Sequence, residues 1–200
     1  MLDSSLQIRL QGPLTEIGRR LAANGVKAEA LVALGFGAGV LAAVLAASGL
    51  YLAALLLLVV NRILGAVEKA MARAGGGSDF SFFLATALDL AFWGAFVLAF
   101  AFADHAAALV SAILLFALMT LAGTSLAFAL AGVRRGLAGE PATADGVGIL
   151  ARLVEETEVA IVFALMCVAP GYYSAMAVLL AFAALATAGF RALLAWRVFR

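Results

Sequence analysis

Residues 61–73 read Asn61-Arg62-Ile63-Leu64-Gly65-Ala66-Val67-Glu68-Lys69-Ala70-Met71-Ala72-Arg73, and they place four charged side chains at the end of a long apolar run. A glycine-rich turn follows, and the next apolar run carries Ser78-Asp79-Phe80-Ser81 at its start and Leu88-Asp89 further in. Two helices joined by this turn would form a hairpin that brings Asp89 toward Glu68. Because ionisable side chains inside a bilayer are costly, these residues are functional candidates by default.

The rest of the chain has the composition of a membrane protein. It is 66% hydrophobic and 12% charged, and its mean hydropathy is +1.13, which leaves too little polar surface for a water-soluble domain of this size. Several apolar runs reach the roughly 20 residues that a transmembrane helix requires, and the sequence lacks the short alternating segments of a transmembrane β-barrel. The composition predicts an all-α membrane protein, and we expect no nucleic-acid partner.

We predict a single membrane domain over residues 1–200 that forms a six-helix transmembrane bundle. Residues 1–26 lack the continuous apolar core of a signal peptide, and their leucine and isoleucine residues recur at helical spacing. This pattern favours an N-terminal amphipathic surface helix, broken at Pro13. The alternative is a helix that caps the bundle by packing on it. The six predicted spans are residues 29–47, 50–73, 81–103, 106–132, 154–170 and 172–196.

The basic residues predict the orientation of the bundle. They precede the first span, lie at the turn between the second and third, flank the loop over residues 133–153, and end the chain. The three other connections contain no lysine or arginine. By the positive-inside rule, both termini face the cytoplasm. We therefore predict a multi-pass protein of a bacterial-type inner (cytoplasmic) membrane.

Other residues with chemical potential are few. Cys167 and His105 are the only cysteine and histidine of the chain, so it lacks the clustered ligands of a haem or zinc site. Cys167 lies in an apolar run and is expected to behave as a small core residue. The glycine-rich segment from Gly35 to Gly39 predicts a close helix approach, either within the bundle or between two chains.

The charged hairpin resembles the signature of the CDP-alcohol phosphatidyltransferase family. In words, that signature is Asp, two residues, Asp-Gly, two residues, Ala-Arg, a spacer, Gly, three residues, Asp, three residues, Asp. Ala72-Arg73 matches the Ala-Arg pair and Asp89 matches the last aspartate, while Glu68 stands at the second aspartate and Lys69 at the glycine after it. The remaining positions have lost the family residue, with Gly65 at the first aspartate, Ser81 at the second glycine and Ala85 at the third aspartate.

The resemblance covers nearly the whole chain, because residues 50–55 and 153–158 also look like helix segments of that family. It implies a six-helix fold with an N-terminal surface helix. In the family, the four aspartates hold two divalent metal ions, which bind the diphosphate of the CDP-alcohol and activate the attacking alcohol. Two close cations need several carboxylate oxygens, and only Glu68 and Asp89 remain to supply them here. We therefore expect no catalytic residue and no cofactor, with Glu68 and Asp89 as remnants.

Lys69 places an ammonium group in the space that the family glycine leaves for the nucleotide. We predict that this charge replaces the metal ions and pairs with Glu68 or Asp89. The alternative is that Lys69 extends to the membrane interface beside Arg73. Arginine binds phosphate well, so the candidate ligand-binding residues are Arg73, at the motif's own arginine, together with Lys69 and Arg62.

The fifth predicted span begins with an acidic cluster. Carboxylates are favourable at a helix N-terminus, so capping accounts for two of the three acids. The third acid, one turn into the membrane, is expected to face the cavity opposite Arg62 or Arg191. The cluster consists of Glu155, Glu156 and Glu158.

Two functions remain open. The first is a catalytically degenerate homologue that acts as a lipid-binding or accessory subunit of a membrane complex, with lipids and a protein partner or a second copy of the chain as its partners. The second is an active phospholipid-synthesising transferase with an altered site, which would use Mg²⁺ or Mn²⁺. The two lost carboxylates and Lys69 favour the first function, while Glu68, Arg73 and Asp89 favour the second. A third class, a small transporter or channel, has little support, because the sequence shows no broken helix pairs of the kind that many transporters contain.

Overall fold

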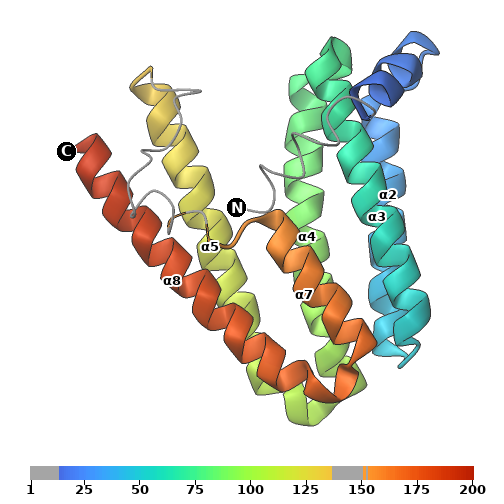
Figure 1. The fold of residues 1–200 in the computed structure, drawn as a ribbon, viewed down its shortest axis with the longest axis vertical. Coiled ribbons are helices and arrows are strands. Elements are labelled where there is room, and N and C mark those ends of the chain that lie inside the picture. The colour runs from blue at the N-terminus through green and yellow to red at the C-terminus, as the bar shows by residue number, and fades with distance from the viewer. Residues whose placement is uncertain (1–13, 137–150, 152) are drawn as a thin grey trace.

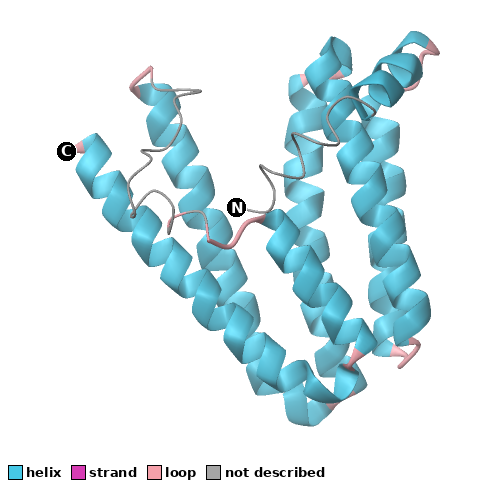
Figure 2. Ribbon diagram, in the orientation of Figure 1, coloured by secondary structure: helices cyan, strands magenta, loops and turns pink. Residues whose placement is uncertain are grey.

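Helices joined by short turns form the described part of the chain (Figures 1 and 2). The computed structural model describes residues 14–136, 151 and 153–200, and no strand occurs within these ranges. A short helix covers residues 14–23. The long helices are α2 (Ala28–Ala47), α3 (Tyr51–Met71), α4 (Asp79–Ala103), α5 (Ala108–Arg134), α7 (Glu156–Val168) and α8 (Tyr173–Phe199).

These bounds confirm an all-α membrane protein and place one helix in each predicted span. Among the described residues, five helical segments are long and apolar enough to cross a membrane. The exception is α7, whose 13 residues extend about 20 Å at 1.5 Å per residue, against an apolar bilayer core of roughly 30 Å. The predicted span over 154–170 is too long because Glu155 has an extended backbone and caps α7, while Pro170 starts a separate turn.

The turn between α3 and α4 is built by glycine and serine. After α3 the backbone widens into one π-type turn, Ala72–Gly76, and it reverses at Gly75, whose φ of +87° lies in the left-handed region that favours glycine. Ser78 and Ser81 then cap α4 reciprocally, each hydroxyl accepting from the other residue's backbone N–H. The Ser78 hydroxyl also donates to Glu29 at 2.8 Å, so the start of α4 is held beside α2.

The helix over residues 14–23 packs on the bundle. Leu14 and Leu21 contact a small buried cluster that includes Met71 at the end of α3. A Cβ at Gly18 would lie 2.7 Å from the Met71 backbone nitrogen, so the two helices touch at the backbone. On the outer face Glu16 pairs with two arginines, and the hydrogen bond from Arg20 lowers its pKa. Within the described residues this helix acts as a cap, while residues 1–13, including Pro13, lie outside them.

Glycine also sets the packing of α2 against α3 and α4. The Asn61 side-chain amide donates to the Gly35 carbonyl at 2.8 Å. A Cβ at Gly39 would lie 2.6 Å from Cδ2 of Phe92 and 3.0 Å from Nδ2 of Asn61. The close helix approach predicted from the glycine-rich segment therefore occurs within the bundle, and it brings α3 and α4 together beneath the charged hairpin.

We expect Gly39→Ala to destabilise the protein by about 1–3 kcal/mol, because the new methyl group overpacks the contact with Phe92. The matched control is Gly37→Ala on the same helix, where a Cβ would meet no atom within 4 Å. Thermal unfolding in detergent measures the difference between the two variants. Equal melting midpoints would show that α2 does not pack this closely.

Two groups of helices make up the bundle, one of α2, α3 and α4 and the other of α5 and α8 (Figure 1). Aromatic side chains fill the contact between α4 and the last two helices. Phe96 stacks on Phe163 of α7 with the ring centroids 4.9 Å apart, and Phe100 stacks on Tyr173 of α8 with the centroids 4.4 Å apart. Cys167 is buried in this core, as predicted. Toward the end that carries the α3–α4 turn and the C-terminus, the two groups diverge, and α7 begins between them partway along the bundle (Figure 1).

Candidate functional site

A cavity of about 870 Å³ lies between the two groups of helices. All six long helices or the residues next to them contribute to its lining, and so does every position of the family signature that we matched. The helix hairpin thus brings together residues that are far apart in the sequence. The lining contains the four aspartate positions Gly65, Glu68, Ala85 and Asp89, and the three candidate binding residues Arg62, Lys69 and Arg73.

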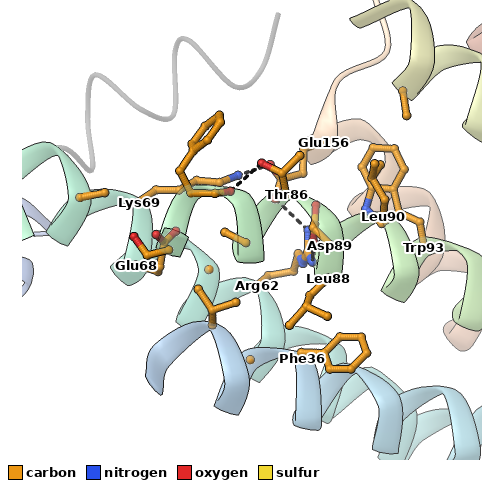
Figure 3. Close-up of a pocket in the computed structure, with 18 of the residues that line it drawn as sticks. Phe36, Arg62, Glu68, Lys69, Thr86, Leu88, Asp89, Leu90, Trp93 and Glu156 are labelled. Atoms are coloured by element: carbon orange, nitrogen blue, oxygen red, sulfur yellow. Dashed lines mark hydrogen bonds and ion pairs between the residues drawn. The ribbon is translucent and has the colours of Figure 1, made fainter. Parts of the chain in front are cut away.

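Arg62 is the centre of the polar side of this cavity (Figure 3). Its Nη2 donates to Oδ1 of Asp89 at 2.5 Å, and its Nη1 donates to Oε1 of Glu156 at 2.9 Å. Its Nε donates to Oδ1 of Asn61 at 2.7 Å, and its guanidinium carbon lies 5.2 Å from the ring centroid of Phe92. One guanidinium therefore ties α3 to α4 and to the start of α7.

Lys69 shares an acidic partner with Arg62. Its ammonium group donates to Oε2 of Glu156, the carboxylate that also accepts from Arg62. The predicted partners of Lys69 were Glu68 or Asp89, but the structure places Lys69 on Glu156 because Arg62 already occupies Asp89. We call Arg62, Lys69, Asp89 and Glu156 the ion-pair network.

Glu156 is the acid of the α7 cluster that faces Arg62. Glu155 caps α7, and the Glu158 side chain accepts from the Glu155 backbone N–H at 3.2 Å. One acid of the cluster faces Arg62, as predicted, but it is Glu156 at the start of α7 and not the acid one turn into the membrane. Arg191, the other predicted partner, donates from α8 to the Leu121 carbonyl at 3.0 Å and to Thr124 on α5.

Sequence reasoning missed the role of Asn61. This side chain is buried, and it accepts from Arg62 while it donates to the Gly35 carbonyl. An amide next to an arginine within an apolar run was the available signal, because a buried polar side chain in a membrane helix needs hydrogen-bond partners. Asn61 therefore fixes the direction from which Arg62 approaches Asp89.

The residues at the signature's aspartate positions do not fit a pair of divalent metal ions. Gly65 and Ala85 have no side-chain oxygen, and Asp89 already accepts from Arg62. In the parts of the chain that the structure describes, no three His, Cys, Asp or Glu side chains converge as a metal site would require. Arg62 and Lys69 instead pair with Asp89 and Glu156.

Two solved structures of one phosphatidylinositol phosphate synthase have the same fold as this chain. A phosphatidylinositol phosphate synthase from Mycobacterium tuberculosis, solved with CDP-DAG bound, superposes with a TM-score of 0.69 and 23% identity, covering 92% of this chain and 93% of that one. The same synthase solved with manganese and citrate gives a TM-score of 0.65 and 21% identity, over 92% and 88% of the two chains. These matches define the chain as a membrane protein with the fold of this synthase.

Similarity to a curated sequence shows the family of the chain. The inner membrane protein YnjF of Escherichia coli (strain K12) is 33% identical over 178 residues, which is 87% of this chain and 85% of the relative. The chain belongs to the family of this inner membrane protein. No family model matches the sequence.

Proposed function

We propose that this chain is a catalytically degenerate member of the CDP-alcohol phosphatidyltransferase class that serves as a lipid-binding or accessory subunit in the inner membrane, with both termini in the cytoplasm. The observation that carries the proposal is the ion-pair network. Arg62 pairs with Asp89 and Glu156, and Lys69 pairs with Glu156. Of these residues, Asp89 stands at one of the four aspartate positions of the signature. The protein's own cations thus balance Asp89 and Glu156 without a metal ion.

The fold and the cavity support a retained binding role. The cavity combines charged side chains with apolar ones, including Phe36 on α2 and Trp93 on α4. A cavity of this size that is mostly apolar, with a few convergent polar groups, is typical of a small-molecule site. The superposed synthase was solved with a lipid, CDP-DAG, so this fold is suited to a ligand with acyl chains. We therefore place the binding of membrane lipids in this cavity.

A transfer assay tests the loss of activity. The purified chain is supplied with CDP-DAG, Mg²⁺ or Mn²⁺ and a panel of alcohol acceptors, and CMP release is measured. We expect no release above that of the Asp89→Asn variant, because Asp89 is already held by Arg62. Metal-dependent CMP release that Asp89→Asn abolishes would contradict the proposal and favour an active transferase with an altered site.

Mass spectrometry after mild-detergent purification tests the accessory role. We expect lipid or a stoichiometric protein partner to remain with the chain. A chain that carries neither, together with metal-dependent CMP release, would favour the transferase.

A further inference from the structure

The ion-pair network leaves three charged side chains of the cavity without a hydrogen-bond or ion-pair partner among the described residues. They are Glu68 on α3, Arg73 in the turn after α3 and Asp79 in the first turn of α4. Arg73 and Asp79 are exposed and can be solvated. Glu68 differs, since only 5% of its surface is exposed, yet it lines the cavity.

The Glu68 side chain lines the cavity. In apolar surroundings a carboxyl group either takes up a proton or is stabilised by an opposite charge, which a ligand in the cavity could supply. The protein's own cations are not in contact with Glu68, because Lys69 turns to Glu156 and Arg62 to Asp89 (Figure 3). An ammonium group in the cavity would give Glu68 this partner. Arg73, in the same cavity, would at the same time bind an anion, and a guanidinium is well suited to phosphate.

We propose that the cavity binds a zwitterionic group with an ammonium and a phosphate, the ammonium on Glu68 and the phosphate on Arg73. This inference rests on the proposed lipid-binding function and names the headgroup chemistry that it selects. The same chemistry occurs in a phosphatidylethanolamine headgroup and in free phosphoethanolamine. The volume of 870 Å³ and the apolar walls leave space for part of an acyl chain beside the headgroup.

The test compares soluble lipids on the full chain in detergent. Dihexanoyl phosphatidylethanolamine, dihexanoyl phosphatidylglycerol and free phosphoethanolamine are titrated by calorimetry against the wild-type protein and its variants. We expect phosphatidylethanolamine to bind about tenfold more tightly than phosphatidylglycerol, the effect of one charge-assisted hydrogen bond. Glu68→Gln keeps the shape of the side chain and should remove this preference. Arg73→Gln should weaken both lipids alike.

The control is Glu16→Gln, an acid on the exposed face of the helix over residues 14–23 and outside the cavity. It should leave the preference unchanged. A preference that persists in Glu68→Gln, or tighter binding of phosphatidylglycerol by the wild type, would overturn the inference while lipid binding stands. If neither lipid and no phosphoethanolamine binds, the proposed lipid-binding function also fails. Phosphoethanolamine that binds as tightly as the lipid supports the inference and identifies a soluble ligand, whereas weaker binding identifies a lipid.

Discussion

Gly65→Asp, Lys69→Gly and Ala85→Asp together are expected to make the cavity bind a divalent cation more tightly than the wild type does. The triple variant adds two carboxylates and removes one ammonium from the same cavity. A Cβ at Gly65 would meet no atom within 4 Å, so the new aspartate has space. Because a unit charge about 4 Å from another contributes roughly 4 kcal/mol at an effective dielectric constant of 20, we expect Mn²⁺ affinity to rise at least about 100-fold.

Electron paramagnetic resonance of free Mn²⁺ measures this binding directly. The matched control replaces the same residues without adding charge, as Gly65→Asn, Lys69→Gly and Ala85→Asn, and it should bind Mn²⁺ far more weakly. If the charged variant folds and binds no more Mn²⁺ than this control, the number of carboxylates does not determine metal binding in this cavity. Restored metal binding without CMP release would indicate that the pocket for the alcohol has also changed.

Arg62→Ala is expected to lower the stability of the folded protein. This change leaves Asp89 without its cation and Glu156 with only Lys69, and it removes the tie between α3, α4 and α7. Breaking a buried ion pair on one side typically costs 3–5 kcal/mol. The side chains of Arg62, Asp89 and Glu156 are 21–32% exposed, so solvent weakens these pairs. We therefore expect the free energy of unfolding to fall by about 2–4 kcal/mol. Thermal unfolding in detergent should show a midpoint lower by roughly 5–15 °C.

Two further variants separate charge from shape. Arg134→Ala, at the exposed end of α5, removes a positive charge outside the network and should change the midpoint little. Arg62→Met with Asp89→Leu replaces the pair by apolar side chains, which can be close to neutral in stability, and it should recover much of the loss. If the single variant Arg62→Ala is as stable as the wild type, the ion-pair network does not hold the helices together.

Much of the fold could be predicted because the apolar runs are long and are interrupted by glycine, proline or charge. The α3–α4 hairpin was predictable for this reason, with Gly75 at the reversal and Ser78 at the cap. The length of α7 could not be predicted, because residues 154–170 form one apolar run with an acidic start. Only the structure shows that Glu155 caps α7 and that Glu156 turns toward α3.

The members of the candidate site were predictable, but their pairing was not. The spacing of the signature placed Glu68, Lys69 and Asp89 near one another, and all three line the cavity. Which acid each cation selects depends on the register between α3, α4 and α7, because these helices meet only in the folded bundle. Glu156 lies 87 residues after Lys69 in the chain, and no local pattern indicates such a contact.

The most direct test of this account is anomalous diffraction from crystals of the wild-type protein soaked in Mn²⁺ and CDP-DAG. We predict no manganese peak between Glu68 and Asp89, with the Lys69 ammonium on Glu156 and the Arg62 guanidinium on Asp89. A manganese ion bound between Glu68 and Asp89, with Arg62 and Lys69 turned away from the acids, would contradict the claim that the protein's own cations have replaced the metal ions.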